Sequence, residues 1–247
     1  MSEKSLKIYA TGEGPTLLFL HGLGSSRRCW DLVINQLKSE YHCCTLELFG
    51  HGSQPPLSSR TTIEGTAEDL NNMLKTVKWH PDIIIGHSLG GLVAASLALQ
   101  NPACARQLVL LDTPTRQVRL KFLHRLTLSA LRKHYKQSIT KQVQRMTRDT
   151  ELQEELIQTN LSTDHASYLQ YMESLLKSDY TSRIREISIP LEAWITRSLA
   201  PDKLTLQKVL HQYGYDHLSP EQVRHMPDAG HFVMLEKPKQ VASFLTT

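Results

Sequence analysis

The sequence has few of the features that mark a membrane protein or a secreted protein. None of its apolar runs approaches the roughly 18 consecutive residues that a membrane-spanning helix needs. Its first residues include neither an apolar stretch nor the small-residue cleavage site of a secretory signal. We therefore expect a cytoplasmic protein without a membrane span.

Cysteine is also scarce, with four residues in a chain of 247. No pair has the spacing of a Cys/His metal site, and the neighbours Cys43 and Cys44 are poor disulfide partners for each other. We predict that all four are reduced residues of the core. Neither a cluster of metal ligands nor a phosphate-binding glycine loop occurs, so we expect no metal and no other cofactor.

Short apolar runs alternate with longer helical patterns over most of the chain. The predicted strands cover residues 16–20, 42–48, 82–86, 107–111, 189–195 and 222–227. The predicted helices cover residues 27–37, 63–77, 89–100 and about 203–213, and a short helix ends the chain. Strands that are apolar on both faces and alternate with helices are typical of an α/β fold, a mostly parallel sheet with helices on both faces. The carboxyl ends of its strands share one edge, where ligands bind.

Between about residues 115 and 186 the strands stop and only helical periodicity remains. We predict a helical cap inserted between two strands of one sheet. Residues 1–114 and 187–247 then form the core, and residues 115–186 form the cap. One domain with an insertion is the expected organisation, and we expect a monomer.

Acidic residues are missing from the first half of this cap. Residues 113–148 include ten Lys or Arg and no Asp or Glu. Such a run is a candidate surface for an anionic partner, while a solvated helix face explains it equally well. We expect no nucleic-acid binding, because stacking aromatic residues are not interleaved with the basic ones. The residues of the candidate surface are Arg116, Arg119, Lys121, Arg125, Arg132 and Lys133.

Residues 86–90, Gly-His-Ser-Leu-Gly, match the G-x-S-x-G pattern of nucleophilic serines. A predicted buried strand precedes them and a predicted helix of small residues follows. A tight turn between these elements exposes the serine hydroxyl above the sheet edge, and the glycines make room for the turn. Ser88 is therefore the candidate nucleophile, with a turn that only links strand to helix as the alternative.

Four motifs, in chain order, resemble those of the α/β-hydrolase fold family. GHSLGG resembles the nucleophile elbow, LFLHGLGSS the loop after the third strand, and LELFGHGSQP the loop after the fourth. DAGHFVMLEKP resembles the segment that carries the catalytic histidine. The resemblance covers roughly residues 5–112 and 187–245. It implies a serine hydrolase of the carboxylesterase type, with the cap inserted after the sixth strand of the family.

The resemblance implies roles for individual residues. His231 is the candidate general base, and the backbone N–H groups of Leu23 and Leu89 are the candidate oxyanion hole. Asp202 and Asp112 are rival candidates for the acid that orients the imidazole, and Asp216 or the absence of any acid is the remaining alternative. Asp202 requires three extra residues in the turn of AWITRSLAPDK, whereas Asp112 directly follows the strand QLVLL. The residues that we expect to contact substrate are His21, Gly22, Trp30, His87, Leu123 and Phe232.

These features predict hydrolysis of a carboxylic ester or thioester through an acyl-Ser88 intermediate. A basic cap over a Ser-His site resembles the esterases that demethylate pimeloyl-acyl carrier protein methyl ester, which makes an acyl carrier protein a candidate partner. Two alternatives remain open, a C–C bond hydrolase or lyase of the same fold and a ligand receptor with a weak triad. Serine rather than aspartate at position 88 argues against dehalogenase or epoxide-hydrolase chemistry.

Overall fold

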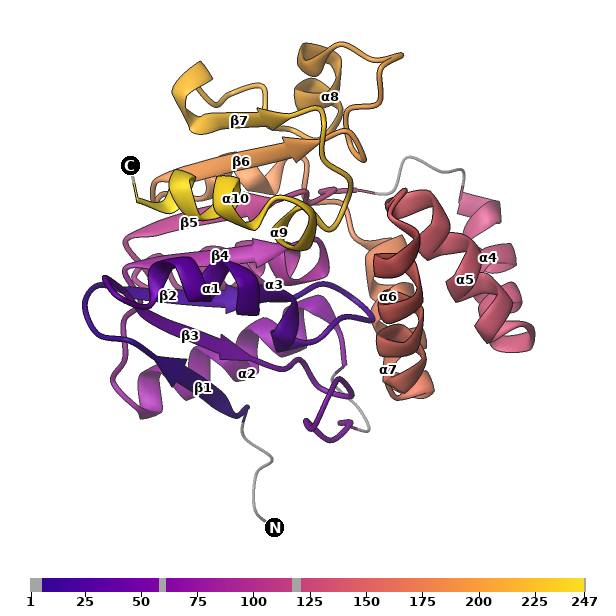
Figure 1. Ribbon diagram of the computed structural model, residues 1–247, viewed down its shortest axis with the longest axis horizontal. Coiled ribbons are helices and arrows are strands. Elements are labelled where there is room, and N and C mark those ends of the chain that lie inside the picture. The colour runs from indigo at the N-terminus through magenta and orange to yellow at the C-terminus, as the bar shows by residue number, and fades with distance from the viewer. Residues whose placement is uncertain (1–5, 58–60, 117–120, 247) are drawn as a thin grey trace.

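The computed structural model describes residues 6–57, 61–116 and 121–246, with residues 121 and 122 described by their backbone alone. Within these residues a seven-stranded sheet has the order β1-β3-β2-β4-β5-β6-β7 (Figure 1). Only β1 is antiparallel, pairing with β3 along one edge. The strands are β1 (Ile8–Thr11), β2 (Thr16–Leu20), β3 (His42–Leu46), β4 (Ile83–His87), β5 (Gln107–Leu111), β6 (Leu191–Thr196) and β7 (Val223–Met226).

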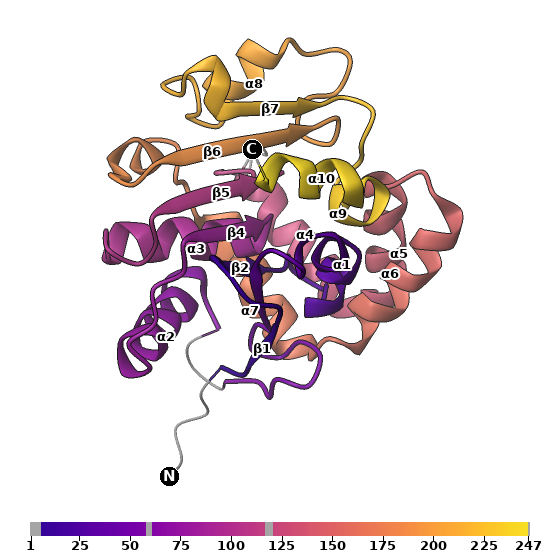
Figure 2. The ribbon, with the colours of Figure 1, turned by 60° about the vertical axis from the view of Figure 1, so that its left-hand side comes forward.

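Helices cover both faces of this sheet (Figure 2). Those outside the long insertion are η1 (Arg27–Trp30), α1 (Asp31–Leu37), α2 (Ile63–Thr76), α3 (Leu89–Gln100), η2 (Arg183–Glu186), α8 (Leu206–Gln212), η3 (Pro220–Gln222), α9 (Val233–Glu236) and α10 (Pro238–Leu245). The prediction of an α/β fold with a mostly parallel sheet is confirmed. The sequence pattern did not predict β1, a short edge strand whose residues are half-buried or exposed.

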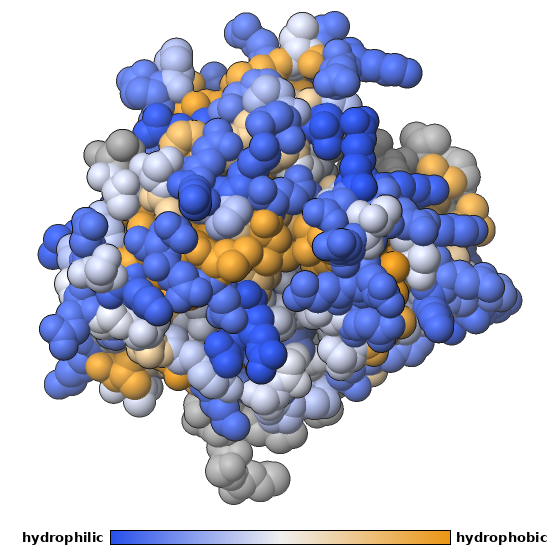
Figure 3. Space-filling model, in the orientation of Figure 1, coloured by the Kyte–Doolittle hydropathy of each residue, from blue (hydrophilic) through white to orange (hydrophobic). Residues whose placement is uncertain are grey.

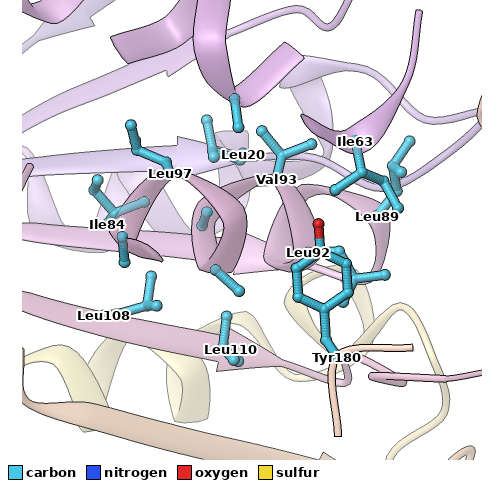
Figure 4. Close-up of a cluster of buried hydrophobic side chains, with 14 of the residues drawn as sticks. Leu20, Ile63, Ile84, Leu89, Leu92, Val93, Leu97, Leu108, Leu110 and Tyr180 are labelled. Carbon is cyan, nitrogen blue, oxygen red and sulfur yellow. The ribbon is translucent and has the colours of Figure 1, made fainter. Parts of the chain in front are cut away.

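Each face of the sheet has its own apolar core. Leu18 and Leu20 of β2 belong to a cluster that includes α2 and α3 (Figure 4), whereas Leu17 and Phe19 lie in a second cluster with α1 and α10. All four side chains are fully buried. Because successive strand residues point to opposite faces, a strand between two helical layers must be apolar throughout. This requirement is the physical reason for the continuous apolar run TLLFL.

Between β5 and β6, residues 121–177 form a helical insertion beyond the carboxyl ends of the strands (Figure 1). Its helices are α4 (Lys121–Lys133), α5 (Tyr135–Met146), α6 (Thr150–Ser162) and α7 (His165–Lys177). Asp149 caps α6 by accepting from the backbone N–H groups of Glu151 and Leu152, and Asp164 caps α7 by accepting from that of Ser167. The hydroxyl groups of Tyr171 on α7 and Thr66 on α2 are 2.9 Å apart, which ties the insertion to the core.

The face in Figure 3 is mainly hydrophilic, and apolar side chains gather near its centre, over α1 and α10. Within the described residues, no helix combines the length and the apolar character needed to cross a membrane. The four cysteines are free and buried.

Candidate active site

Ser88 lies in the turn between β4 and α3, at the carboxyl edge of the sheet. Its backbone has φ 53° and ψ −115°, a left-handed conformation that residues other than glycine rarely adopt. The flanking glycines are needed because the turn is closely packed. A Cβ atom on Gly86 would lie 2.5 Å from Gly91 Cα, and one on Gly90 would lie 2.5 Å from the carbonyl oxygen of His21. Ser88 thus has the strained strand-to-helix geometry of a nucleophile elbow.

The imidazole of His231, in the loop between β7 and α9, contacts the carboxylate of Asp112 after β5. His231 Nδ1 lies 2.6 Å from Asp112 Oδ2. Asp112 Oδ1 accepts hydrogen bonds from the Thr196 backbone N–H at 3.0 Å and from the Thr196 hydroxyl at 2.7 Å. Asp112 is fully buried, so these bonds hold its carboxylate in one orientation. An N–H at Nδ1 that donates to Asp112 leaves Nε2 available to accept a proton.

The rival acid does not occupy this position. Asp202 is exposed in the turn between β6 and α8, and the carboxylate against His231 Nδ1 is that of Asp112. At the end of β6, the backbone N–H and the hydroxyl of Thr196 donate hydrogen bonds to Asp112. These bonds hold the Asp112 carboxylate beside the imidazole, in the place that an acid after β6 would otherwise take. Asp216, a third possibility, binds Arg185 and His211 elsewhere on the protein.

Two buried histidines brace the loop that follows β2. The His21 Nδ1–H donates to the Gly22 carbonyl at 2.8 Å, and His21 Nε2 accepts from the Leu48 N–H at 3.1 Å. His51 Nε2 accepts from the Gly24 N–H at 3.0 Å. Burial lowers the pKa of His21 to about 4 and that of His51 to about 3, so both rings are neutral near pH 7. Sequence reasoning did not single out His51, although it lies between two glycines in LELFGHGSQP.

The candidate oxyanion donors flank Ser88. Among the described residues, the backbone N–H groups of Leu23 and Leu89 have no hydrogen-bond acceptor. The Leu23 loop passes close to the serine, because a Cβ on Gly22 would lie 3.2 Å from Ser88 Cβ and 2.9 Å from His87 Nδ1. A side chain at position 22 would collide with His87, so glycine allows the loop that carries Leu23 to pass beside the nucleophile.

A cavity of about 570 Å³ lies between the core and the helical insertion. Ser88 and His231 both line it, together with Leu23 and Phe232. Its apolar walls from the insertion are Leu131, Val143, Met146, Met172, Leu175 and Leu176. Within the described residues Ser88 Oγ and His231 are not hydrogen-bonded to each other, and such bonds often tighten only when substrate binds.

Comparison with known proteins decides the family. The sequence model of the alpha/beta hydrolase family matches residues 17–244. The chain belongs to this family. Solved structures agree in fold: a hydrolase from Oleispira antarctica has a TM-score of 0.86 at 20% identity, covering 98% of this chain and 94% of that one. An esterase from Thermogutta terrifontis has a TM-score of 0.81 at 22% identity, covering 98% and 91%.

Curated relatives of this alpha/beta hydrolase are similar over shorter segments. The chain is 38% identical over 91 residues to the magnesium-chelatase 30 kDa subunit of Rhodobacter capsulatus, which is 36% of this chain and 32% of that protein. It is 33% identical over 105 residues to the pimeloyl-[acyl-carrier protein] methyl ester esterase of Aliivibrio salmonicida, 42% of this chain and 38% of that one. The chain thus spans less than half the length of either relative.

The loop that carries His231 in this alpha/beta hydrolase is held from both sides. Its backbone N–H donates to the carbonyl oxygen of Met146, the last residue of α5, at 3.0 Å. Its carbonyl oxygen accepts from His87 Nε2–H at 2.8 Å. Burial, and then the proximity of His231, lower the pKa of His87 well below its usual value, so the His87 ring is neutral. The position of the candidate base therefore depends on the neighbour of the nucleophile and on the helical insertion.

Three of the six predicted substrate contacts line the cavity and three do not. Gly22, His87 and Phe232 line it. His21 has both ring nitrogens bound to backbone, and the fully buried Trp30 packs on Phe19 with ring centroids 5.0 Å apart. Leu123 is half-buried on α4. The division has one cause, because an apolar or histidine side chain near the site faces either the cavity or the core, and sequence alone does not distinguish the two.

The basic residues of the insertion differ in their exposure and in whether they line the cavity, which the sequence did not predict. Arg125, Arg132 and Lys133 are exposed on α4. Arg116 is half-buried, and its backbone pairs with Asp179, so it is a poor member of an open surface. Arg119 and the side chain of Lys121 lie outside the described residues. None of the described four lines the cavity, whereas two other basic residues, Lys141 and Arg145 of α5, do.

The described ranges bring together no group of three or more His, Cys, Asp or Glu side chains with the geometry to hold a metal ion.

Proposed function

We propose that this alpha/beta hydrolase cleaves a carboxylic ester or thioester through an acyl-Ser88 intermediate, with His231 as the general base and Asp112 as its orienting acid. The observation that carries the proposal is the 2.6 Å contact between His231 Nδ1 and the buried Asp112 carboxylate, beside a cavity that Ser88 also lines. The strained backbone of Ser88 adds support, since such strain is common at functional sites.

The reaction begins when Ser88 Oγ bonds to the carbonyl carbon of the substrate and its proton passes to His231 Nε2. Asp112 stabilises the imidazolium that results. The negative oxygen of the tetrahedral intermediate accepts hydrogen bonds from the N–H groups of Leu23 and Leu89, and the loss of one such donor typically costs about 10²–10³ in rate. Collapse of the intermediate breaks the ester or thioester bond, and the leaving group takes the proton from His231.

Water completes the cycle. His231 Nε2 takes a proton from a water molecule as the water oxygen bonds to the acyl carbon of the Ser88 ester. The second tetrahedral intermediate collapses, Ser88 Oγ recovers its proton from His231, and the carboxylic acid leaves. The mechanism needs no metal and no cofactor, because the nucleophile, base and oxyanion donors all belong to this chain.

The test is pre-steady-state hydrolysis of p-nitrophenyl butyrate. We expect a burst of p-nitrophenol equal to the enzyme concentration, because the ester acylates Ser88 before water releases the acyl group. Ser88→Ala eliminates the burst. Repeated turnover of the wild type distinguishes the enzyme from a receptor with a slow triad, which would release about one equivalent and stop. Failure of simple esters to react, with turnover of a vinylogous diketone, would instead favour a C–C bond hydrolase.

A carrier-bound acyl ester is a finer form of the same proposal. Support comes from the 33% identity with the pimeloyl-[acyl-carrier protein] methyl ester esterase and from Arg125, Arg132 and Lys133, which are exposed on α4 beside the cavity-lining helices. Acyl carrier proteins are acidic, so the positive charges of α4 attract them. Added salt screens this attraction and shortens its range. We expect hydrolysis of the carrier-bound ester to weaken between 50 mM and 500 mM salt, while a free neutral ester is unaffected. Equal salt dependence of the two would contradict carrier binding at α4.

A further inference from the structure

Helix α5 lines the catalytic cavity along one face. Ser138, Lys141, Gln142, Arg145 and Met146 all line it, at spacings of three, four, seven and eight residues from the first. These intervals place the five side chains on one side of a helix. The residues of this face differ in their exposure to solvent. Met146 is half-buried and the neighbouring Val143 is buried, whereas Lys141 and Arg145 are exposed. The two cations therefore lie at the solvent end of the cavity wall.

No described residue that lines the cavity neutralises these cations. The residues that line it include no Asp and no Glu. Lys141 and Arg145 form no ion pair with any described residue, whereas other surface cations such as Lys177 and Arg106 do. Among the described residues, the candidate site thus combines a mostly apolar lining with two exposed cations that have no ion-pair partner. Such an arrangement favours a ligand that is apolar along most of its length and negative at one end.

We propose that Lys141 and Arg145 bind an anionic group, a carboxylate or a phosphate, at the end of the substrate remote from the scissile ester. The proposal rests on the hydrolysis at Ser88 proposed above and names the class of acyl substrate that this site selects. The guanidinium of Arg145 pairs with two oxygens of such a group, and the Lys141 ammonium adds a second charge one helical turn away. Both residues act on recognition, and the chemistry at Ser88 is the same for any ester that reaches it.

The experiment compares matched esters of one chain length. The monomethyl esters of straight-chain dicarboxylic acids carry a terminal carboxylate, and the corresponding dimethyl esters do not. For the wild type at low salt we expect kcat/KM to be about tenfold higher for the monomethyl ester, which corresponds to about 1.4 kcal/mol. In the double variant Lys141→Gln/Arg145→Gln the ratio of the two kcat/KM values falls to about one. Arg145→Glu reverses the preference toward the neutral ester.

A matched control removes two charges without touching the cavity. Lys136 on α5 and Arg148 just after it are exposed and do not line the cavity. The variant Lys136→Gln/Arg148→Gln has the same net charge as the test variant, and we expect it to keep the wild-type ratio. A loss of preference in the control as well would mean that overall charge, not this pair, attracts the anion, and would overturn the assignment.

The source of the anion is decided by a third ester that ends in a phosphate monoester instead of a carboxylate. A higher kcat/KM for the phosphate assigns the pair to phosphate, and a higher value for the carboxylate assigns it to a dicarboxylic half-ester. If the wild type hydrolyses all of these esters at equal rates, the anion proposal fails while the hydrolase proposal stands. If it hydrolyses none of them and forms no burst, the proposed function itself fails.

Discussion

The backbone N–H of His231 donates a hydrogen bond to the carbonyl oxygen of Met146, 3.0 Å away. Met146 is the last residue of α5, where helix carbonyls have no partner within the helix. The bond satisfies one of these carbonyls and joins the helical insertion to the candidate base. On the same helix, Lys141 and Arg145 line the mouth of the cavity. The same helix therefore contacts the His231 loop and carries the two cations that we propose bind the substrate.

Gly230→Ala tests this connection. A Cβ at position 230 would lie 2.7 Å from the Met146 carbonyl oxygen and 2.6 Å from Glu236 Oε1, so the loop and α5 must move apart. Because misplacement by about 1 Å can cost about 10²-fold in rate, we expect kcat for a simple ester to fall by about that factor. Thermal unfolding should show a folded protein. An unchanged kcat would mean that the position of His231 does not depend on α5.

Asp112→Asn and Asp202→Asn distinguish the two acids that the sequence left open. Replacement of the carboxylate that binds His231 Nδ1 favours the wrong tautomer, which in the Ser-His-Asp hydrolases costs about 10⁴ in kcat. We expect a loss of this order for Asp112→Asn and a change of less than about twofold for Asp202→Asn, since Asp202 is exposed and away from the imidazole contact. A larger effect at Asp202, measured by steady-state kinetics, would contradict the assignment.

His87→Phe tests the second anchor of the His231 loop. Phenylalanine removes the donor to the His231 carbonyl, and an unsatisfied buried acceptor typically costs about 1–3 kcal/mol. We expect a decrease in the free energy of unfolding within this range and a lower kcat. His87→Gln keeps a side-chain N–H and should recover part of both. Chemical denaturation and kcat for the two variants check the prediction, and equal behaviour of Phe and Gln would count against a role for this bond.

Because the two histidines that brace the β2 loop are neutral, we expect the free energy of unfolding to decrease in acid. Burial lowers the pKa of His21 to about 4 and of His51 to about 3, so at pH values between these and 6.5 the unfolded chain binds more protons than the folded one. Their contribution is complete above pH 6.5 and is lost as the pH falls below it. Each contributes a slope of about 1.4 kcal/mol per pH unit. His51→Gln should reduce the slope between pH 6 and pH 4.5 by about this amount, measured by urea unfolding, and an identical slope would contradict the account.

The sequence predicted those parts of the protein that depend on local pattern. The turn at Ser88 is an example, because a buried strand, two glycines and a small-residue helix determine it within about 15 residues. The strand Thr16–Leu20 is another, since a strand covered on both faces is apolar at every position. The short strand β1 was missed because the residues of IYAT are half-buried or exposed and give little signal.

The local sequence pattern did not predict contacts between segments that are far apart in the chain. The choice between Asp112 and Asp202 depends on how the ends of β5 and β6 meet, where the donors of Thr196 face Asp112. The sequence does not distinguish Lys141 and Arg145 from the other basic residues of the insertion. The packing of the helices determines which face of α5 is turned toward the cavity. Trp30, which we predicted to contact substrate, is fully buried and packs on Phe19, and its local sequence does not indicate this orientation.

Activation of Ser88 is tested most directly by its reaction with a fluorophosphonate probe, followed by peptide mass spectrometry. We expect one adduct per protein, on the peptide that contains Ser88. The adduct is absent from Ser88→Ala, and it forms far more slowly in His231→Ala because the proton of the hydroxyl then has no acceptor. A folded wild-type protein that forms no adduct, or forms it at the same rate without His231, would contradict the account.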